Sequence, residues 1–354
     1  MSLFDYDPEG HSLVLADGRE LLVHDGGTEA PRWRTEVATR IVGVGSNLLS
    51  IVSLDELGQL VIWSHETATE VRSMSLGVPA TGLVHDSEGR CGAIHPGGVI
   101  TMVGGDPTEH VVPGATAAAF AADGQLLVGT GDGALHRFDA QGAPLGTAQV
   151  PGPVADIAFN AGGFFLIANG GAVHRLDGLE VSHVTNAPEG APVRGVASSP
   201  DGSRIALHVG DHQVFVLTYP GRETEGHAQY GDRIINGIAF GPGDWFGVGL
   251  EGGDGNKFDL RTGATHRTDT HPGRPHNRWI LMNGFGQAEE PPPARQEPAR
   301  QEPARQAPPA AAAPRPAGGM APAPEPGMPA GMKIFLAAAV VILILSVIVA
   351  GMVG

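Results

Sequence analysis

The stretch VADIAFNAGGFFLIANGGAVHRLDG (Val154–Gly178) decides the fold, because it contains three short strand patterns separated by glycine-containing turns. Apolar and polar residues alternate in VADIAF and AVHRLD, which is the period of a β-strand. The middle run FFLIA (Phe164–Ala168) is apolar on both faces. A strand of this kind has to be covered on both sides, so we expect the unit to lie between two similar units.

The same pattern recurs along residues 1–286, most clearly in Ala115–Gly142, Val193–Gly221 and Ile235–Gly263. Two markers keep a common phase through seven copies. The residue of the first turn recurs at Gly10, Asn47, Gly89, Gly124, Gly163, Gly202 and Gly243, at intervals of 37, 42, 35, 39, 39 and 41. The end of the third strand recurs at Asp25, Ser64, Gly104, Asp139, Asp177, Thr218 and Asp259, at intervals of 39, 40, 35, 38, 41 and 41.

A repeat of about 39 residues with room for four strands is typical of a propeller blade. The sequence therefore predicts an all-β domain over residues 1–286, a seven-bladed β-propeller. Small residues in the first strands, such as Ala117–Ala119, fit strands that crowd toward a central channel. A closed ring also leaves only short strand edges exposed. We expect Ser2–Asp7 and Arg278–Met282, at opposite ends of the array, to pair and close the ring.

The repeats resemble the WD40 family of β-propellers. The resemblance is carried by SPDG (Ser199–Gly202), by DGALHRFD (Asp132–Asp139) and by Trp63 in VIWS. No copy ends in Trp-Asp, and Gly226–His227 is the only candidate for the family's Gly-His pair. We therefore expect no blade to assemble the family's Asp–His–Ser/Thr–Trp hydrogen-bond network. The positions expected to carry the repeat are Asp25, Trp63, Asp139, Asp177, Asp259, Gly124, Gly163 and Gly202.

Charge and cysteine content limit the function classes. The 354-residue chain has a formal net charge of −16, and the charges from residue 287 onward cancel, so residues 1–286 carry all of it. This argues against nucleic acid as a partner and favours proteins with a basic surface. The single cysteine, Cys91, excludes a disulfide framework and a Cys-based zinc site. The N-terminus MSLFDYDPEG contains no signal peptide pattern. The bias toward arginine over lysine suggests a GC-rich bacterial genome.

The C-terminal part differs from the repeats. Residues 287–331 contain 13 prolines and the pentads PPARQ-EPARQ-EPARQ (Pro292–Gln306), so we expect a disordered linker that cannot form a core. Residues 332–354 contain 20 consecutive uncharged residues, Ile334–Val353, long enough for one transmembrane helix. Lys333 flanks this stretch on the propeller side, which favours a tail-anchored, single-pass membrane protein whose propeller faces the cytoplasm.

Catalytic motifs are absent from the sequence. It contains no GxxxxGK[ST], HExxH or GxSxG pattern, and we expect no cofactor and no metal. His136 and His174 occupy the same slot in two repeats, which indicates a structural role better than metal ligation. We expect Asp139, Asp177 and Asp259 to accept hydrogen bonds from turn amides.

Two functions agree with these patterns. The first is a non-catalytic scaffold, a WD40-like propeller that binds proteins at the cytoplasmic face of a bacterial membrane. The alternative is a propeller hydrolase or lactonase with a metal such as Ca²⁺ in the central channel. No convergent set of ligands can be named for the second function.

Overall fold

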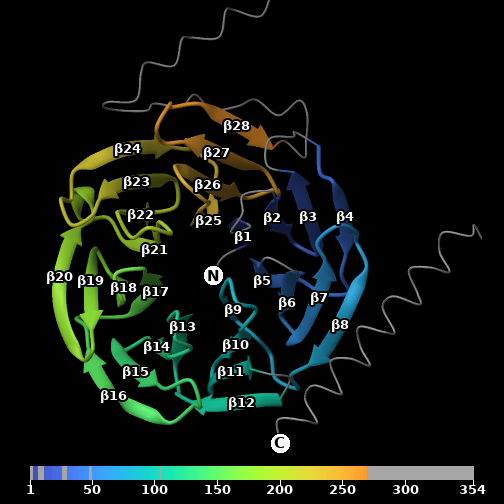
Figure 1. Cartoon of the computed structure of the whole chain (residues 1–354), viewed down its shortest axis with the longest axis horizontal. Helices are drawn as coiled ribbons and strands as arrows, with labels where there is room; N and C mark the ends of the chain where they lie inside the picture. Colours follow the sequence, from blue (N-terminus) through green and yellow to red (C-terminus); the bar gives the residue numbers. More distant parts are fainter. Residues whose placement is uncertain (1–2, 7–11, 26–29, 48–49, 104–105, 269–354) are drawn as a thin grey trace, which may run out of the picture. The chain divides into compact units, whose positions relative to one another are not determined.

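Seven four-stranded antiparallel sheets form a ring in the computed structural model, which describes residues 3–6, 12–25, 30–47, 50–103 and 106–268. Figure 1 looks down the axis of this ring, with β1, β5, β9, β13, β17, β21 and β25 nearest the centre. Each sheet consists of four strands that follow one another in the sequence, and each strand pairs with the next. The fold predicted from the sequence, a seven-bladed β-propeller, is confirmed.

We letter the strands of each blade a to d from the centre outward. Blades 1 and 2 are β1(Phe4–Tyr6), β2(Ser12–Asp17), β3(Glu20–Asp25), β4(Trp33–Glu36), and β5(Ile41–Ser46), β6(Ser50–Asp55), β7(Gln59–Ser64), β8(Glu70–Ser75). Blades 3 and 4 are β9(Gly82–His85), β10(Cys91–His95), β11(Gly98–Val103), β12(Asp106–Val111), and β13(Ala115–Phe120), β14(Leu126–Thr130), β15(Ala134–Phe138), β16(Pro144–Gln149).

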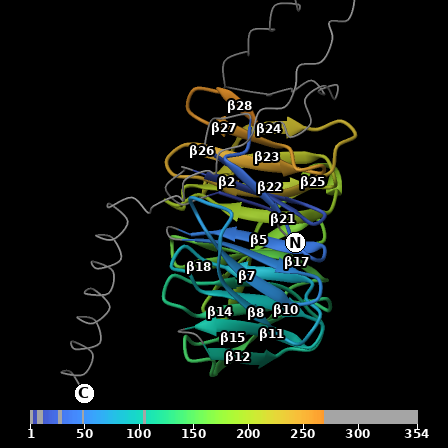
Figure 2. The same cartoon turned by 90° about the vertical axis from the view of Figure 1, so that its right-hand side faces the viewer.

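The remaining blades follow the same plan. Blade 5 is β17(Val154–Asn160), β18(Phe164–Asn169), β19(Ala172–Asp177), β20(Glu180–Asn186), and the 3₁₀ turn Pro188–Gly190 follows it. Blades 6 and 7 are β21(Val193–Ser198), β22(Arg204–Val209), β23(Gln213–Thr218), β24(Thr224–Gln229), and β25(Ile235–Phe240), β26(Trp245–Leu250), β27(Gly255–Asp259), β28(Thr265–Thr268). The ab and cd turns lie at one end of every blade, and the bc turns and da loops lie at the other end. We call these ends the ab–cd face and the bc–da face, and Figure 2 shows the ring from the side.

The core is divided among the blade interfaces. One cluster of buried apolar side chains lies between each pair of neighbouring blades, including the pair formed by blades 7 and 1. Between blades 5 and 6, for example, Leu166 packs in the same cluster as Val193 and Ile205, and each is at most 1% exposed. All six residues of β18 are buried, as the two-sided apolar pattern of FFLIA predicts. Stability therefore depends on every blade having both neighbours.

Near the centre, strand a of one blade and strand a or b of the next approach more closely than a side chain allows. A Cβ at Gly43 would lie 2.3 Å from Leu83 Cβ in blade 3, and a Cβ at Gly249 would lie 2.3 Å from Phe4 Cβ in blade 1. In five blades, strand a also has a register shift after its first residue, at Ile41, Ala115, Val154, Val193 and Ile235. Such bulges bend a strand and increase its twist, and here they recur beside the channel.

The ring closes by packing between blades 7 and 1. Strand β1 pairs with β2 inside blade 1, and the backbone N–H of Leu3 donates a hydrogen bond to the carbonyl of Asn236 in blade 7 (3.2 Å). Blade 7 is completed by β28, so no described sheet combines strands from both ends of the array. The predicted partner of the N-terminal strand, Arg278–Met282, lies outside the described residues.

The linker predicted over 287–331, the helix predicted over 332–354 and its flank Lys333 also lie outside the described residues. Within the part of the chain that the structure describes, no helix is both long enough and apolar enough to cross a membrane.

Candidate functional site: the ab–cd face

The four aspartates at the ends of strand c perform two different tasks. Asp139 Oδ1 accepts hydrogen bonds from the backbone N–H groups of Gln141 (2.9 Å) and Ala143 (2.8 Å), and this holds the cd turn of blade 4. Asp259 Oδ1 holds the cd turn of blade 7 in the same way, from the N–H groups of Arg261 (2.9 Å) and Thr262 (3.1 Å). Both carboxylates lie where the sequence places them, at the start of a turn.

The other two aspartates pair with arginines. Asp177 lies 2.6 Å from Arg175 Nη2, and Asp25 lies 3.1 Å from Arg32 Nη1. For Asp177 the structure therefore shows an ion pair where we expected a turn-amide acceptor. These aspartates are on separate blades at the ends of strand c, away from the channel, and the structure does not bring them together in one site.

The three glycines singled out in the sequence lie in ab turns. Gly124, Gly163 and Gly202 have φ angles of +86°, +87° and +73°. This left-handed region costs a side chain with a Cβ roughly 1 kcal/mol or more, which explains why glycine recurs there. These glycines allow the turns to form, and they have no side-chain group that could bind a ligand or take part in catalysis.

Trp63 makes a side-chain hydrogen bond inside blade 2, as in part of the network that the WD40 resemblance implies. Its Nε1–H donates to Ser53 Oγ (2.9 Å) between strands c and b of blade 2, and Trp63 is 7% exposed. Asp55, at the end of strand b, accepts a hydrogen bond from the hydroxyl of Thr39 in the da loop. Among the described residues the complete network is found in no blade, but its serine–tryptophan bond forms in blade 2 and threonine bonds the aspartate. These bonds differ from the expected pattern because Thr39, and not a histidine, bonds the aspartate.

Other blades tie the da loop to the bc turn or to the end of strand b with different chemistry. In blade 7 the guanidinium of Arg233 donates to the buried carboxylate of Asp254. In blade 5 the side-chain amide of Asn169 donates to the carbonyl of Pro151 (2.5 Å). A hydrogen bond or ion pair from the da loop therefore recurs in several blades, but different residue types make it. This contributes to the degeneracy of the repeat in sequence.

Strands a of blades 1 to 3 place three polar residues together at the channel. Asp5 Oδ2 accepts a hydrogen bond from the N–H of Ser46 (2.6 Å) and lies 3.5 Å from His85 Nε2. The hydroxyl of Ser46 lies 3.2 Å from His65 Nε2, but the other nitrogen of that ring, Nδ1, lies 3.5 Å from the guanidinium of Arg32. A cation at this position cannot orient an imidazole as the carboxylate of a catalytic triad does. The channel contacts of blades 1 to 3 thus hold neighbouring strands together.

A second titratable pair lies near the axis, where blades 5 and 6 meet. Asp156 Oδ2 accepts a hydrogen bond from the N–H of Val196 (2.9 Å), and burial raises the pKa of Asp156. His208 is 8% exposed, and burial, followed by the charge of Arg194, lowers its pKa to about 4. In both groups the shift of the pKa has the same main cause, burial of the side chain where the two blades pack together.

No group of three or more His, Cys, Asp or Glu side chains within the described ranges is placed to hold a metal ion. His174 lies against His183 of the neighbouring strand, with ring centroids 5.7 Å apart, and His136 faces Thr147 across the same pair of strands in blade 4. Cys91 lines a cleft of about 110 Å³ between blades 2 and 3. Its burial, reinforced by Asp86, raises the pKa of the thiol to about 11, so it is a poor nucleophile at neutral pH.

Arginines near the ab–cd face connect neighbouring blades. Arg90 Nη2 donates to the carbonyl of Ala121 in blade 4 (3.1 Å), and Arg137 Nη1 donates to the carbonyl of Gly178 in blade 5 (2.7 Å). Arg175 Nη1 donates to the hydroxyl of Tyr219 in blade 6 (3.4 Å), and its guanidinium lies 4.1 Å from the ring centroid of Phe164. In the sequence, Arg137 and Arg175 directly follow His136 and His174 at the same position of two repeats. This repetition is the sequence pattern that indicates a shared role in linking blades.

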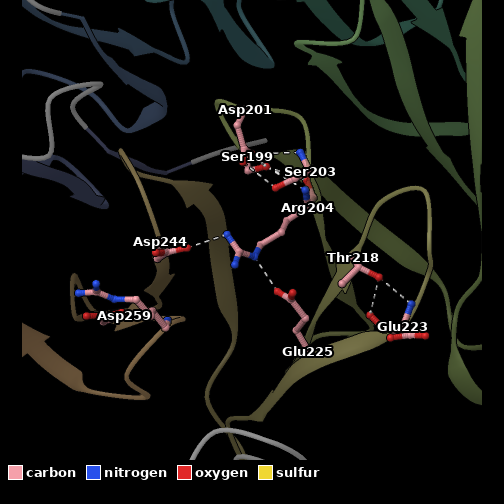
Figure 3. Close-up of polar contacts among 10 residues, drawn as sticks. Ser199, Asp201, Ser203, Arg204, Thr218, Glu223, Glu225, Asp244 and Asp259 are labelled. Atoms are coloured by element: carbon pink, nitrogen blue, oxygen red, sulfur yellow. Dashed lines mark hydrogen bonds and ion pairs between the residues drawn. The ribbon is translucent and has the colours of Figure 1, made fainter.

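The strongest of these links joins blades 6 and 7 (Figure 3). Arg204 Nε donates to Glu225 Oε2 (2.6 Å), and Arg204 Nη1 donates to Asp244 Oδ1 (2.8 Å). Burial alone would lower the pKa of Arg204, but the two carboxylates raise it. Nearby, hydrogen bonds from Ser199 and Ser203 hold the pKa of Asp201 at about 2. No local sequence pattern marks Arg204, because its partner Glu225 lies in another strand of blade 6 and its partner Asp244 lies in blade 7.

An apolar groove lies next to this arginine, between the outer strands of blade 6 and the face of blade 7. It is small, with about 20 Å³ of space for a water-sized molecule. Its walls are formed by Val216, Gly226 and Ala228 on blade 6 and by Phe246, Leu260 and Gly263 on blade 7. Asp259 also lines the groove. The backbone N–H of Leu260 donates to the carbonyl of Asp244 (2.7 Å), so the cd turn that lines the groove is bonded to the ab turn that carries a partner of Arg204.

Comparison with solved structures identifies similar propellers. The β-propeller domain of Cps50 (Swd1) from Myceliophteria thermophila aligns with a TM-score of 0.60 and 13% identity over 70% of this chain and 92% of that domain. A chain of a mitotic checkpoint complex aligns with a TM-score of 0.60 and 16% identity over 71% of this chain and 86% of that chain. No protein-family model and no curated protein matches the sequence. At these identities the likeness establishes the β-propeller fold.

Proposed function

We propose that this protein is a non-catalytic interaction scaffold held at the cytoplasmic face of a bacterial membrane, and that it binds a protein with a basic surface. A propeller presents two broad loop-lined faces, and one of the similar solved chains is part of a mitotic checkpoint complex. Within the described residues, the polar groups at the channel contact neighbouring strands and do not converge on a free position. The scaffold function is therefore better supported than the metal-dependent hydrolase.

The observation that carries the proposal is the distribution of charge on the ab–cd face. Four arginines donate hydrogen bonds to neighbouring blades, and their guanidinium groups are therefore engaged in contacts within the protein: Arg90, Arg137, Arg175 and Arg204. Carboxylates at the same end of the blades are exposed, namely those of Glu66, Glu88, Asp123, Asp177, Glu180, Asp201 and Glu223. Arg222 and Arg261 are exposed there as well, but the acids outnumber them. A basic partner would be steered to this face and oriented on it.

The membrane part of the proposal is supported by the sequence. The apolar stretch Ile334–Val353 has the length of a bilayer core, and Lys333 beside it favours a cytoplasmic flank. A tether of residues 287–331 would raise the effective concentration of the propeller toward other membrane proteins without a new contact. Anionic lipid would repel a domain of charge −16, which leaves a protein as the partner.

The test is photocrosslinking of the full chain in intact membranes, followed by identification of the captured protein. The variant Glu66→Gln, Glu180→Gln and Glu223→Gln removes three exposed charges from the ab–cd face. The control variant Glu36→Gln, Glu56→Gln and Glu251→Gln removes three exposed charges from the bc–da face. We expect the first variant to reduce capture about tenfold at low salt, and the control variant to reduce it less than twofold. Equal effects of the two variants would contradict the assignment of the face.

Two further measurements test the tether. Protease added outside right-side-out cells should leave the propeller intact if it faces the cytoplasm. Deleting residues 332–354 should abolish function at native expression, whereas replacing Pro292–Gln306 with a Gly/Ser spacer of equal reach should preserve it. If the deleted protein retains full function, the tether has no part in it.

A further inference from the structure

The sulfur-containing side chains of the described propeller meet at one cleft. The described ranges contain one cysteine, Cys91, and two methionines, Met74 and Met102. All three line the cleft of about 110 Å³ between blades 2 and 3. They come from three strands of two neighbouring blades, β8, β10 and β11 (Figure 1). Their convergence is therefore a product of the tertiary structure, and no sequence motif records it.

The two walls of the cleft hold the sulfur atoms on opposite sides of a narrow space. Cys91 and Met102 are directly opposite each other in the antiparallel register of β10 and β11, so their Cβ atoms lie roughly 5 Å apart on one face of blade 3. Met74 of β8 is opposite Leu60 of β7, and both line the cleft from blade 2. Leu60, Cys91 and Met102 belong to one buried cluster, and Met74 packs against it. One wall thus carries a thiol and a thioether, and the other carries a second thioether.

The thiol of Cys91 is buried and faces the cleft without a hydrogen-bond partner. Cys91 is 4% exposed, and within the described ranges no hydrogen bond to its sulfur is found. The cleft reaches the surface, because Arg72 and Ser73 of β8 and Gly89 of the ab turn line it and are exposed. A small ion therefore has a route from the rim of the propeller to the sulfur atom.

The side chains around the cleft select the class of ion. Among the described residues that line it there is no carboxylate and no imidazole. Ca²⁺ and Mg²⁺ need several oxygen ligands, and structural Zn²⁺ needs four ligands from cysteine, histidine or carboxylates. Burial raises the pKa of the Cys91 thiol, Asp86 raises it further and Arg72 lowers it, so a guanidinium lies near enough to disfavour a divalent cation. Thiolate and thioether sulfurs are the soft ligands that select Cu(I).

We propose that the cleft between blades 2 and 3 binds one Cu(I) ion through the thiolate of Cys91 and the thioethers of Met74 and Met102. The Cu–S bond forms as the S–H bond of Cys91 breaks, the proton passes to solvent, and copper keeps its oxidation state. The ion replaces the charge of that proton, so the buried ion and thiolate are together neutral. Because its ligands come from both blades, the ion links blade 2 to blade 3. This site does not depend on the scaffold function.

Anaerobic titration of the full chain with Cu(I) in detergent tests the site. A colorimetric Cu(I) chelator competes with the protein for the ion, and near-ultraviolet absorption reports the bond between copper and the thiolate. We expect one tightly bound Cu(I) per chain. Cys91→Ala removes the anionic ligand and should weaken binding at least about 100-fold, with loss of the absorption. Equal affinities of the unchanged chain and Cys91→Ala would overturn the proposal.

Methionine variants separate ligation from packing, because leucine keeps the volume of methionine and removes its sulfur. In the full chain carrying Met74→Leu and Met102→Leu, we expect the affinity for Cu(I) to fall at least about tenfold while the unfolding midpoint without copper stays nearly the same. X-ray absorption at the copper edge should show three sulfur neighbours in the unchanged chain and one in this variant.

The control variant removes three methionines that lie outside the described residues, Met320→Leu, Met328→Leu and Met332→Leu. It should bind Cu(I) as the unchanged chain does. Loss of binding in this control would place the ion on the C-terminal part and would overturn the proposal. An unchanged affinity in the variant Met74→Leu and Met102→Leu would show that these thioethers only pack in the core, and would overturn it as well.

Discussion

The centre and the rim of this propeller solve the same packing problem in different ways. At the centre, Gly43 and Gly249 let a strand of the next blade approach so closely that a Cβ would lie 2.3 Å from its neighbour. At the rim, the blades diverge, and long side chains such as Arg137 and Arg204 cross the gap to the next blade. Beside Arg204, between blades 6 and 7, a small apolar groove remains.

In a ring of blades, one residue type cannot suit every position between the axis and the rim. Strands that fan out from an axis are crowded at the inner end and separated at the outer end, so the inner positions select glycine and alanine. The outer positions select arginine, whose guanidinium can reach carbonyls and carboxylates of another blade. Substitutions at the centre should therefore cost more than substitutions at the rim. The following predictions use residues 1–286, which we expect to fold without the C-terminal part because every blade lies within them.

The largest effect is expected for Gly249→Val at the centre. The new side chain would collide with Phe4 where the ring closes, and overpacking of this severity costs about 3 kcal/mol or more. Urea denaturation followed by tryptophan fluorescence measures the loss. Gly131→Ala is the control, because a Cβ there would lie 3.7 Å from its nearest neighbour, Thr116 Cγ2, and should cost under about 1 kcal/mol. Similar losses in both variants would contradict the crowding of the centre.

The second effect depends on pH. Burial, together with Arg194, lowers the pKa of His208 from 6.5 to about 4 in the folded protein. The unfolded chain therefore binds a proton between these pH values that the folded protein does not bind, and stability falls as the pH is lowered through this window. The loss amounts to roughly 3 kcal/mol. Denaturation midpoints measured between pH 7 and pH 4 should fall less steeply in His208→Gln. An unchanged slope would show that His208 is not the group responsible.

The third effect is at the rim. Arg204→Met removes the bonds to Glu225 and Asp244 and leaves both carboxylates without the guanidinium. The side chains are partly exposed, so water replaces part of the interaction, and we expect a loss of about 1–2 kcal/mol. Arg261→Ala, on an exposed turn of blade 7, is the control and should change stability by less than about 0.5 kcal/mol. Denaturation at low and high salt should show a smaller difference at high salt.

The smallest effect is expected for Val71→Thr on the outermost strand of blade 2. Val71 is 67% exposed, so the change should alter stability by less than about 0.5 kcal/mol. The same denaturation assay measures it. A loss above 1 kcal/mol would show that something covers this strand and would weaken the contrast between the centre and the rim.

Much of the fold could be predicted from the sequence because strand alternation and turn glycines are local properties. Gly124, Gly163 and Gly202 mark the ab turns, and Asp139 and Asp259 mark the cd turns, all in the phase that the structure confirms. The candidate face was harder to predict. Trp63 was recognised, but its partner Ser53 and the substitution of Thr39 for histidine were not, because a different residue performs the same bond.

The sequence by itself determined the number of blades, their strand order and the location of the net charge, because each follows from a pattern repeated along one chain. Only the tertiary structure decided which side chains meet. Arg204 and Asp244 are 40 residues apart, and Phe4 and Gly249 lie at opposite ends of the array. Such contacts depend on the register, the bulges and the twist of neighbouring blades, which act together when the ring closes and which no local pattern records.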